Sequence, residues 1–314
     1  MMAARRLAIT LGDPRGIGPE VARAALLALA GEAGLPEFLL VGPEGVLPDS
    51  RFPLYETGTW RAGGDAVAAG QHAGRAVETA VQLVRDGEVQ GLVTAPLDKS
   101  ALHAAGYDYP GHTEMLAALA GGVDVAMMMS AETTSLGGPL RVVLATTHHA
   151  LRDVPRLFDE NVLVTQTQIT YLALQQQWAI ARPRIALCAF NPHASDQGLF
   201  GDEEARIYVP AMQRLNTLDM PALGPLPADT VFTRALRGEF DAVIAPYHDV
   251  GMAAFKTASF GQGVNVTLGL PFVRTSPDHG TAFDIAGRGV ADASSMIAAI
   301  RLAARLVERT EATR

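Results

Sequence analysis

The chain has 314 residues, 48% of them hydrophobic and 18% charged, with a formal net charge of −8 at pH 7. This length suffices for one large or two modest domains, and the apolar content excludes an extended disordered chain. The acidic balance, without a basic stripe, excludes nucleic acid as an expected partner. The apolar stretch before Gly12 is too short for a signal peptide or a membrane span. Together with the single cysteine, Cys188, these features predict a cytoplasmic protein that does not contact membranes.

Apolar runs alternate with helical spacings along the whole chain. In chain order, strands are expected at 6–11, 38–41, 91–95, 123–129, 141–147, 185–190 and 242–247. Helices are expected at 19–29, 66–85, 99–105, 113–119, 159–176, 203–215 and 293–309. Such alternation predicts an α/β protein with mainly parallel sheets, although composition does not reveal its domain boundaries.

Three histidines each follow an apolar, β-branched run that is typical of a buried strand. They are His148, His193 and His248. Ligands of open α/β sheets bind beyond the carboxyl ends of strands, so three imidazoles in this context can meet around one divalent metal. Unrelated loop histidines with local hydrogen bonds are the alternative, and the repeated context favours a shared metal site.

Two segments near expected helix starts are candidates for anion binding. His112 and Thr113 stand side by side, where Thr113 either caps the helix or joins His112 in binding a phosphate or carboxylate. The glycine-containing segment from Gly12 to Glu20 is either an anion-binding helix start or a tight strand-to-helix turn.

Further polar residues follow His248 at intervals of eight or nine positions, namely Lys256, Asn265 and Arg274. Arg274 comes directly after an apolar run, where a guanidinium can grip a phosphate with two parallel hydrogen bonds. A solvated surface charge is the alternative for this residue.

The segment from Asp278 to Gly289 is dense in glycine and polar residues. Small residues allow close backbone approach by a ligand, and a plain surface loop is the alternative. A carboxylate at Asp284 can accept hydrogen bonds from an adenosine ribose and repels a 2′-phosphate, which favours NAD over NADP.

Several motifs occur in order along nearly the whole chain. They are Gly12-Asp13-Pro14-x-Gly16-Ile17-Gly18-Pro19-Glu20, Thr94-Ala95-Pro96-Leu97-Asp98-Lys99, Gly111-His112-Thr113-Glu114, Asn191-Pro192-His193-Ala194, Tyr247-His248-Asp249 and Gly269-Leu270-Pro271-x-x-Arg274-Thr275-Ser276-x-Asp278-His279-Gly280-Thr281-Ala282. Together they resemble the 4-hydroxythreonine-4-phosphate dehydrogenase family of vitamin B6 synthesis. The segment from His279 to Gly289 also resembles the adenosine loop of isopropylmalate and isocitrate dehydrogenases.

The resemblance implies two α/β/α domains of the isocitrate/isopropylmalate dehydrogenase kind, with the active site in the interdomain cleft. Residues 1–125 and 268–314 would form the NAD-binding side, and 126–267 would carry the metal ligands and the dimer contacts. A homodimer with a shared site is implied, in which one metal-ligating histidine comes from the partner subunit.

The resemblance also assigns roles to individual residues. The metal ligands would be His148, His193 and His248; the substrate contacts would be His112, Thr113, Lys256, Asn265 and Arg274; the NAD contacts would be His279, Gly280, Thr281 and Asp284. The implied cofactors are NAD and one divalent metal, either zinc, cobalt, manganese or magnesium.

The implied reaction is oxidation and decarboxylation of 4-phosphooxy-threonine to 3-amino-2-oxopropyl phosphate, a step of pyridoxal phosphate biosynthesis. The metal would act as a Lewis acid on the substrate hydroxyl and on the enolate that decarboxylation leaves. The catalytic base would be Lys256 or Asp249, and the sequence does not choose between them.

Two departures from the family pattern leave other substrates open. Val250 replaces the glutamine that usually follows Tyr-His-Asp, and the segment 194–198 replaces the usual Ala-Gly-Glu-x-Gly. A paralogue acting on 4-phospho-threonate or 4-phospho-erythronate is one alternative. A terephthalate cis-dihydrodiol dehydrogenase is less favoured, because the His112-Thr113 pair is intact.

Two further alternatives belong to other classes of protein. A metal-dependent aldolase or hydrolase acting on a phosphorylated sugar acid would also use three histidines, but it has no need of the loop that carries Asp284. A non-catalytic phospho-ligand sensor would share the pocket, although the chain shows no added DNA-binding or signalling segment.

Overall fold

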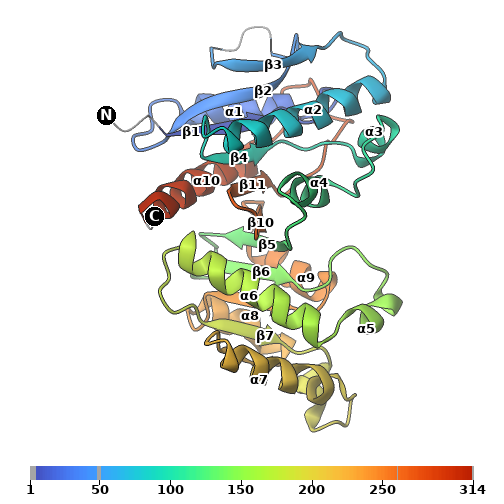
Figure 1. The fold of residues 1–314 in the computed structure, drawn as a ribbon, viewed down its shortest axis with the longest axis vertical. Helices are drawn as coiled ribbons and strands as arrows, with labels where there is room; N and C mark the ends of the chain where they lie inside the picture. The colour runs from blue at the N-terminus through green and yellow to red at the C-terminus, as the bar shows by residue number, and fades with distance from the viewer. Residues whose placement is uncertain (1–4, 48–50, 260, 313–314) are drawn as a thin grey trace. The chain divides into compact units, whose positions relative to one another are not determined.

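The structure is a computed structural model that describes residues 5–47, 51–259 and 261–312. Two compact units are formed: unit 1 comprises residues up to 123 together with 270–312, and unit 2 comprises 124–269. Unit 1 is therefore assembled from both ends of the chain, which Figure 1 draws in blue to green and in orange to red.

Unit 1 contains a parallel sheet with the strand order β3-β2-β1-β4-β11. Its strands are β1 (Arg6–Thr10), β2 (Glu37–Glu44), β3 (Leu54–Thr59), β4 (Gly91–Thr94) and β11 (Val273–Pro277). In the register, Thr10 lies opposite Thr94 and Val93 lies opposite Thr275. The carboxyl ends of three neighbouring strands therefore meet at one edge of this sheet.

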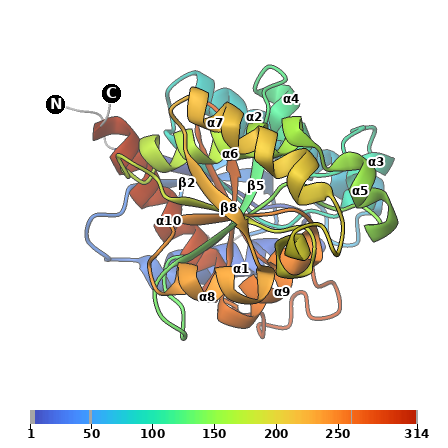
Figure 2. The same cartoon turned by 90° about the horizontal axis from the view of Figure 1, so that it is seen from below.

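The helices of unit 1 are α1 (Gly18–Leu29), α2 (Ala66–Arg85), α3 (Lys99–Ala104), α4 (His112–Leu119) and α10 (Ser294–Ala312). Asp65 and Asp98 cap α2 and α3 by accepting a backbone N–H of the first turn, as short acidic side chains do at this position. Helix α10 packs on β4 and β11, while α2 packs on β1 and β2. Figure 2 shows α1 and α2 on opposite sides of this sheet.

Unit 2 contains a mixed sheet with the strand order β10-β5-β6-β9-β7-β8. Its strands are β5 (Ala126–Ala131), β6 (Leu140–Leu144), β7 (Ile185–Cys188), β8 (Ala222–Leu226), β9 (Ala242–Ala245) and β10 (Val264–Leu268). Strand β5 is antiparallel to both β6 and β10, and the pairs among β6, β9, β7 and β8 are parallel.

Helices cover both faces of the unit 2 sheet. They are α5 (Val154–Leu157), α6 (Glu160–Gln176), α7 (Val209–Thr217), α8 (Ala228–Leu236) and α9 (His248–Ser259), with short turns η1 (Leu151–Asp153), η2 (Pro192–Asp196) and η3 (Glu204–Tyr208). Figure 2 shows α6 and α7 on one side and α8 and α9 on the other. No helix in the described ranges is long and apolar enough to cross a membrane.

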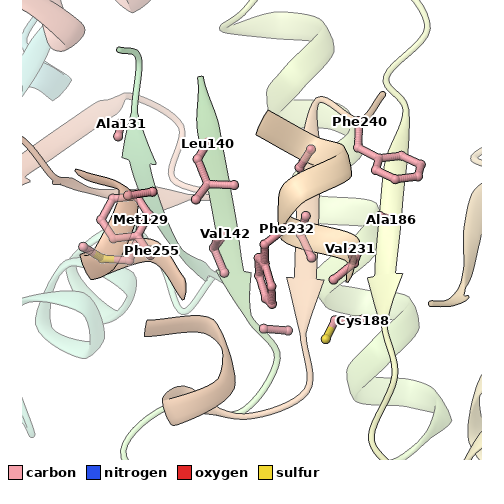
Figure 3. Packing of buried hydrophobic residues seen from close by; sticks show 14 of the residues in the cluster. Met129, Ala131, Leu140, Val142, Ala186, Cys188, Val231, Phe232, Phe240 and Phe255 are labelled. Atoms are coloured by element: carbon pink, nitrogen blue, oxygen red, sulfur yellow. The ribbon is translucent and has the colours of Figure 1, made fainter. Parts of the chain in front are cut away.

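A buried apolar cluster fixes α8 and α9 to this sheet. In Figure 3, Phe232 of α8 and Phe255 of α9 lie among strand residues that include Met129 and Val142. Burying an aromatic or aliphatic side chain of this size contributes roughly 1.5–3 kcal/mol, so the cluster holds the first residue of α9 in a defined place. Cys188 belongs to the same cluster, and burial raises the pKa of its thiol to about 12.

The α/β architecture with mainly parallel pairing is confirmed, whereas several elements were not predicted. Strands β3, β8, β10 and β11 and helices α5, α8 and α9 have no counterpart among the expected elements. Pro225 and Pro227 concealed the β8–α8 segment, although an edge strand tolerates proline because one row of its N–H groups has no ladder partner. Gly251 concealed α9; a Cβ there would come within 2.7 Å of Leu144, so glycine permits the close packing of this helix.

Candidate active site

A buried arginine lies at the carboxyl edge of the unit 1 sheet. Arg274 on β11 is only 2% exposed, and its Nη2 donates a hydrogen bond of 2.6 Å to Thr94 Oγ1 at the end of β4. Burial lowers the pKa of Arg274 to about 10, an effect that Glu114 opposes, so the guanidinium stays charged at neutral pH. A surface charge, the alternative for this residue, is therefore wrong.

His112 lies close to the same arginine, at the first residue of α4. Burial lowers the pKa of His112 well below its usual range, and the positive charges of Arg274 and Lys99 lower it further. Its Nε2 is buried and has no hydrogen-bond partner among the residues that the structure describes. Gly111 is the N-cap of α4 and no side chain caps the helix, so Thr113 is not a cap and its hydroxyl is available for another role.

Stability is expected to fall below pH 6.5 because His112 is held neutral. Since folding lowers the pKa of this imidazole below 6.5, the unfolded chain takes up a proton in that range that the folded chain does not. The free energy of unfolding therefore decreases as the pH falls through 6.5, by up to about 1.4 kcal/mol per pH unit. Urea titrations of the wild type and of His112→Asn measure this effect. The variant should lack that part of the slope, and equal slopes would contradict the prediction.

The segment from Gly12 to Glu20 forms a tight turn that holds the loop after β11. Gly12 has a φ of +70°, and a Cβ there would lie 2.1 Å from the backbone oxygen of Pro96, just after β4. Only glycine fits such a conformation and approach, so the interpretation as a tight turn is correct. The Ile17 N–H donates to Thr281 O at 2.9 Å. The Glu20 carboxylate accepts from the N–H groups of Gly287 (2.9 Å) and Ala291 (3.3 Å).

The loop held in this way contains the residues predicted to contact NAD. Nε2 of His279 is buried and has no partner in the described ranges, while its Nδ1 lies 3.1 Å from Gly280 O. Arg15 lies over the ring of Phe283, 5.1 Å from its centroid. Asp284 is exposed to solvent, which places its carboxylate within reach of a bound molecule.

In unit 2, two of the three predicted metal ligands lie together. His148 follows β6 and His248 begins α9 after β9, and because β6 and β9 are parallel neighbours their ring centroids are 5.3 Å apart. Asp249 Oδ1 lies 2.9 Å from Nδ1 of His248, which leaves Nε2 of that imidazole to face another partner. Two imidazoles at this separation suit binding to one cation.

His193 lies in a left-handed turn after β7. Its φ is +52°, and the following residues through Gln197 also have positive φ although none is glycine. The family pattern has glycine at position 195, where this chain has Ser195, whose Oγ accepts from Gly198 N at 3.2 Å. Within residues 5–47, 51–259 and 261–312 of a single chain, no three His, Cys, Asp or Glu side chains are grouped to hold a metal.

The remaining predicted substrate contacts lie on two elements of unit 2. Lys256 is exposed in the last turn of α9, two turns beyond His248. Asn265 is on β10, and its Oδ1 is buried without a hydrogen-bond partner among the described residues.

Sequence reasoning missed the residues that support these groups. Thr94 stands in a motif that was recognised, but its hydrogen bond to Arg274 spans 180 positions. Glu20 was read as part of a turn, and its bond to Gly287 spans 267 positions. Lys99 ends the motif that begins at Thr94 and is one of only two lysines in the chain, but its effect on the pKa of His112 was not predicted.

Comparison with solved structures first defines the class of protein. A β-decarboxylating dehydrogenase from Thermococcus kodakarensis shares the fold, with a TM-score of 0.52, 17% identity, and coverage of 93% of this chain and 80% of that one. A terephthalate 1,2-cis-dihydrodiol dehydrogenase from Burkholderia xenovorans is more similar, with a TM-score of 0.66, 29% identity and coverage of 96% and 98%. The fold is thus that of the isocitrate/isopropylmalate-type dehydrogenases, as the sequence predicted.

Higher similarity defines the family. Residues 43–303 match the family described as "Pyridoxal phosphate biosynthetic protein PdxA". A 4-hydroxythreonine-4-phosphate dehydrogenase from Paracoccus denitrificans is 42% identical, over 98% of this chain and 100% of that one. The crystal structure of the enzyme of this name from Klebsiella pneumoniae has a TM-score of 0.86 and 37% identity, with coverage of 97% and 98%. The chain belongs to the PdxA family, and it is a dehydrogenase of pyridoxal phosphate biosynthesis.

Proposed function

We propose that this protein catalyses the NAD- and metal-dependent oxidation and decarboxylation of 4-phosphooxy-threonine to 3-amino-2-oxopropyl phosphate. One observation carries the proposal. Buried polar atoms are nearly always hydrogen-bonded, yet His112 Nε2, Asn265 Oδ1 and His279 Nε2 have no such partner among the described residues. These three side chains are among those that the sequence assigned to substrate and NAD, and a bound ligand would satisfy them.

The phosphate of the substrate is held by the buried cationic group of unit 1. Arg274 supplies a fixed positive charge that Thr94 orients, and His112 and Thr113 add polar groups at the start of α4. A buried guanidinium binds an oxyanion more strongly than an exposed one because water competes less. The intact group supports a phosphorylated substrate over a terephthalate dihydrodiol.

The divalent metal is held by His148, His193 and His248. The imidazole donors suit zinc or cobalt, whereas manganese and magnesium suit them less because both prefer oxygen ligands. When bound, the cation supplies Lewis-acid stabilisation of negative charge on the substrate oxygen. Asp249 orients the His248 ring through Nδ1 and so directs its other nitrogen to the metal.

His193 reaches the site as the partner subunit's contribution in a homodimer. The described part of a single chain groups two imidazoles but no three potential ligands. Apolar side chains directly after the left-handed turn are exposed, with Leu199 at 71% and Phe200 at 47%. Exposed apolar groups beside an incomplete site support burial of this segment against a second copy.

Of the two candidates that the sequence left open, we assign the role of catalytic base to Lys256. The Asp249 carboxylate is hydrogen-bonded to His248 and therefore serves the metal ligand. Lys256 lies on the same helix as His248 and carries an amine that would accept the hydroxyl proton.

Substitution of these two residues should separate metal binding from chemistry. Asp249→Asn is expected to weaken metal binding by about 10–100-fold, the usual effect of losing an outer hydrogen-bonding carboxylate. Lys256→Met is expected to abolish NADH formation while metal affinity stays at the wild-type value. Metal titrations and NADH absorbance measure the two effects. If Lys256→Met still formed NADH, Lys256 would not be the base and Asp249 would be the remaining candidate.

The loop after β11 would hold NAD, which would supply the hydride acceptor for the oxidation. His279, Gly280, Thr281 and Asp284 contact it, and the Asp284 carboxylate disfavours the 2′-phosphate of NADP. The hydrogen bonds from Glu20 and Ile17 to this loop hold its backbone in place for the dinucleotide. We place this reaction in the cytoplasm.

The substrate is tested with a panel of phosphohydroxythreonine, phosphothreonate, phosphoerythronate and terephthalate dihydrodiol, with each metal supplied in turn. The highest kcat/KM for NAD reduction is expected with phosphohydroxythreonine. The departure at Val250 does not favour a paralogue, because this side chain packs against the apolar core of unit 2. Preference for phosphothreonate or phosphoerythronate would overturn the substrate assignment. If no substrate led to NADH formation, the alternative of a non-catalytic phospho-ligand sensor would be favoured.

A further inference from the structure

A buried carboxylate lies behind the turn that carries His193. Glu204 in η3 is only 4% exposed. Its Oε1 accepts from the backbone N–H groups of Phe190 (3.0 Å) and Asn191 (2.7 Å), and its Oε2 accepts from Asn191 Nδ2 at 2.9 Å. Three donors therefore converge on one desolvated carboxylate, an arrangement that makes each hydrogen bond strong.

The hydrogen bonds fix the chain where it enters the left-handed turn. Phe190 and Asn191 directly precede Pro192 and His193. From His193 to Gln197 the φ angles lie between 45° and 65°, a region that costs conformational free energy for residues with a side chain. Such a turn persists only where its surroundings hold it, and Glu204 holds the two residues that lead into it.

Neighbouring carboxylates allow only one orientation of the Asn191 side-chain amide. Its Nδ2 also donates to Glu203 Oε2 at 2.7 Å, so a reversed amide would place its oxygen against two carboxylates. Gly201 completes the arrangement, because a Cβ there would lie 2.6 Å from Glu203 Oε2 and 2.7 Å from Asn191 Nδ2.

Aromatic contacts connect the same segment to the residue before His248. The ring of Phe190 stacks on Phe158 at 5.5 Å and meets Tyr247 edge-on at 6.2 Å. Tyr208, on the η3 turn that also carries Glu204, donates to Cys188 O at 2.7 Å. The entry to the His193 turn is thus tied both to β7 and to the start of α9.

We propose that Glu204 is a positioning residue, which sets the direction in which His193 presents its imidazole for metal binding. This role rests on the proposed function, in which His193 is a metal ligand. In Glu204→Gln, the amide NH₂ must face either the two backbone N–H groups or Asn191 Nδ2. The first orientation sets the amide NH₂ against two donors and the second sets it against one, and Glu203 prevents Asn191 from reversing its own amide to relieve the second conflict.

The test is Co²⁺ binding by the metal-free, full-length dimer, followed by visible absorption. Glu204→Gln is expected to weaken Co²⁺ binding by at least about 10-fold and to change the absorption of the saturated site. Glu203→Gln, which alters the same Asn191 contact but no backbone bond, is the matched control and should change affinity less than about 3-fold. A purely structural role would reduce the folded fraction without altering the spectrum of the saturated site.

A second variant keeps the test decisive if Glu204→Gln does not fold. Gly201→Ala places a Cβ 2.7 Å from Asn191 Nδ2, which displaces this amide from Glu204 itself, so this variant is also expected to weaken Co²⁺ binding. Wild-type affinity and spectrum in folded Glu204→Gln, or in Gly201→Ala if the former does not fold, would overturn the positioning role. A wild-type protein that binds no Co²⁺ would instead overturn the proposed metal site itself, on which this role depends.

Discussion

His193→Ala is expected to lose bound metal and NADH formation together. Removal of one of three imidazole ligands should weaken metal binding by more than the roughly 100-fold that loss of an outer hydrogen bond costs. The exposed imidazole of His149, next to His148, provides the control, since His149→Ala should retain both properties. A variant at position 193 that loses the metal but keeps full turnover would refute the role of the metal.

Mixed dimers show which subunit supplies the third ligand. When His193→Ala and His148→Ala chains are combined, half of the dimers are mixed, and one of the two sites in each mixed dimer is intact if His193 acts across the interface. About a quarter of wild-type activity should then return from two inactive variants. If each chain supplied all three ligands to its own site, no activity would return.

Arg274→Met is expected to abolish use of a phosphorylated substrate without unfolding the protein. Loss of a buried charged contact to an anion corresponds to about 3–4 kcal/mol of transition-state stabilisation, or roughly 10²–10³-fold in kcat/KM. The hydrogen bond from Arg274 to Thr94 is to a neutral hydroxyl, so Arg274→Met leaves no unpaired charge at that contact and the protein should stay folded. This combination distinguishes a binding role from a structural one.

Inorganic phosphate provides a separate measure of the same group. Phosphate should raise the Tm of the wild type but not that of Arg274→Met, because a ligand stabilises the state that binds it. Arg301→Met is the control, since Arg301 pairs with Glu32 at the surface of unit 1, at 2.7 Å. Equal phosphate protection of wild type and Arg274→Met would contradict an anion site at Arg274.

Local patterns were sufficient to predict the alternating fold and the elements that precede the histidines. Apolar, β-branched runs identify β6, β7 and β9, although each strand ends two or three residues earlier than expected. The predicted turn at Gly12 follows from the positive φ that its close approach to another strand requires. These features depend on residues that lie close together in sequence.

The remaining features depend on contacts between distant residues. The hydrophobic pattern of the segment 248–259 is interrupted by Gly251, and only the packing of that glycine on β6 explains the helix. One sequence does not reveal the order of the strands or the paths of the loops. It therefore could not predict the hydrogen bond between Thr94 and Arg274 or the three hydrogen bonds to Glu204. For the same reason, the apolar runs predicted three histidines without showing which two lie together in one chain, although the family resemblance implied that one of the three comes from a partner subunit.

The discontinuity of unit 1 has a consequence for synthesis on the ribosome. Strand β11 pairs with β4, and α10 packs on both, so this unit needs residues from 270 onward before its sheet and core are complete. Unit 2 is continuous in sequence and is fully translated earlier. Domains generally fold as units during translation, with the N-terminal one first. Here the order is reversed. Unit 2 can fold on the nascent chain while the residues up to 123 cannot complete unit 1 until 270–312 have been synthesised.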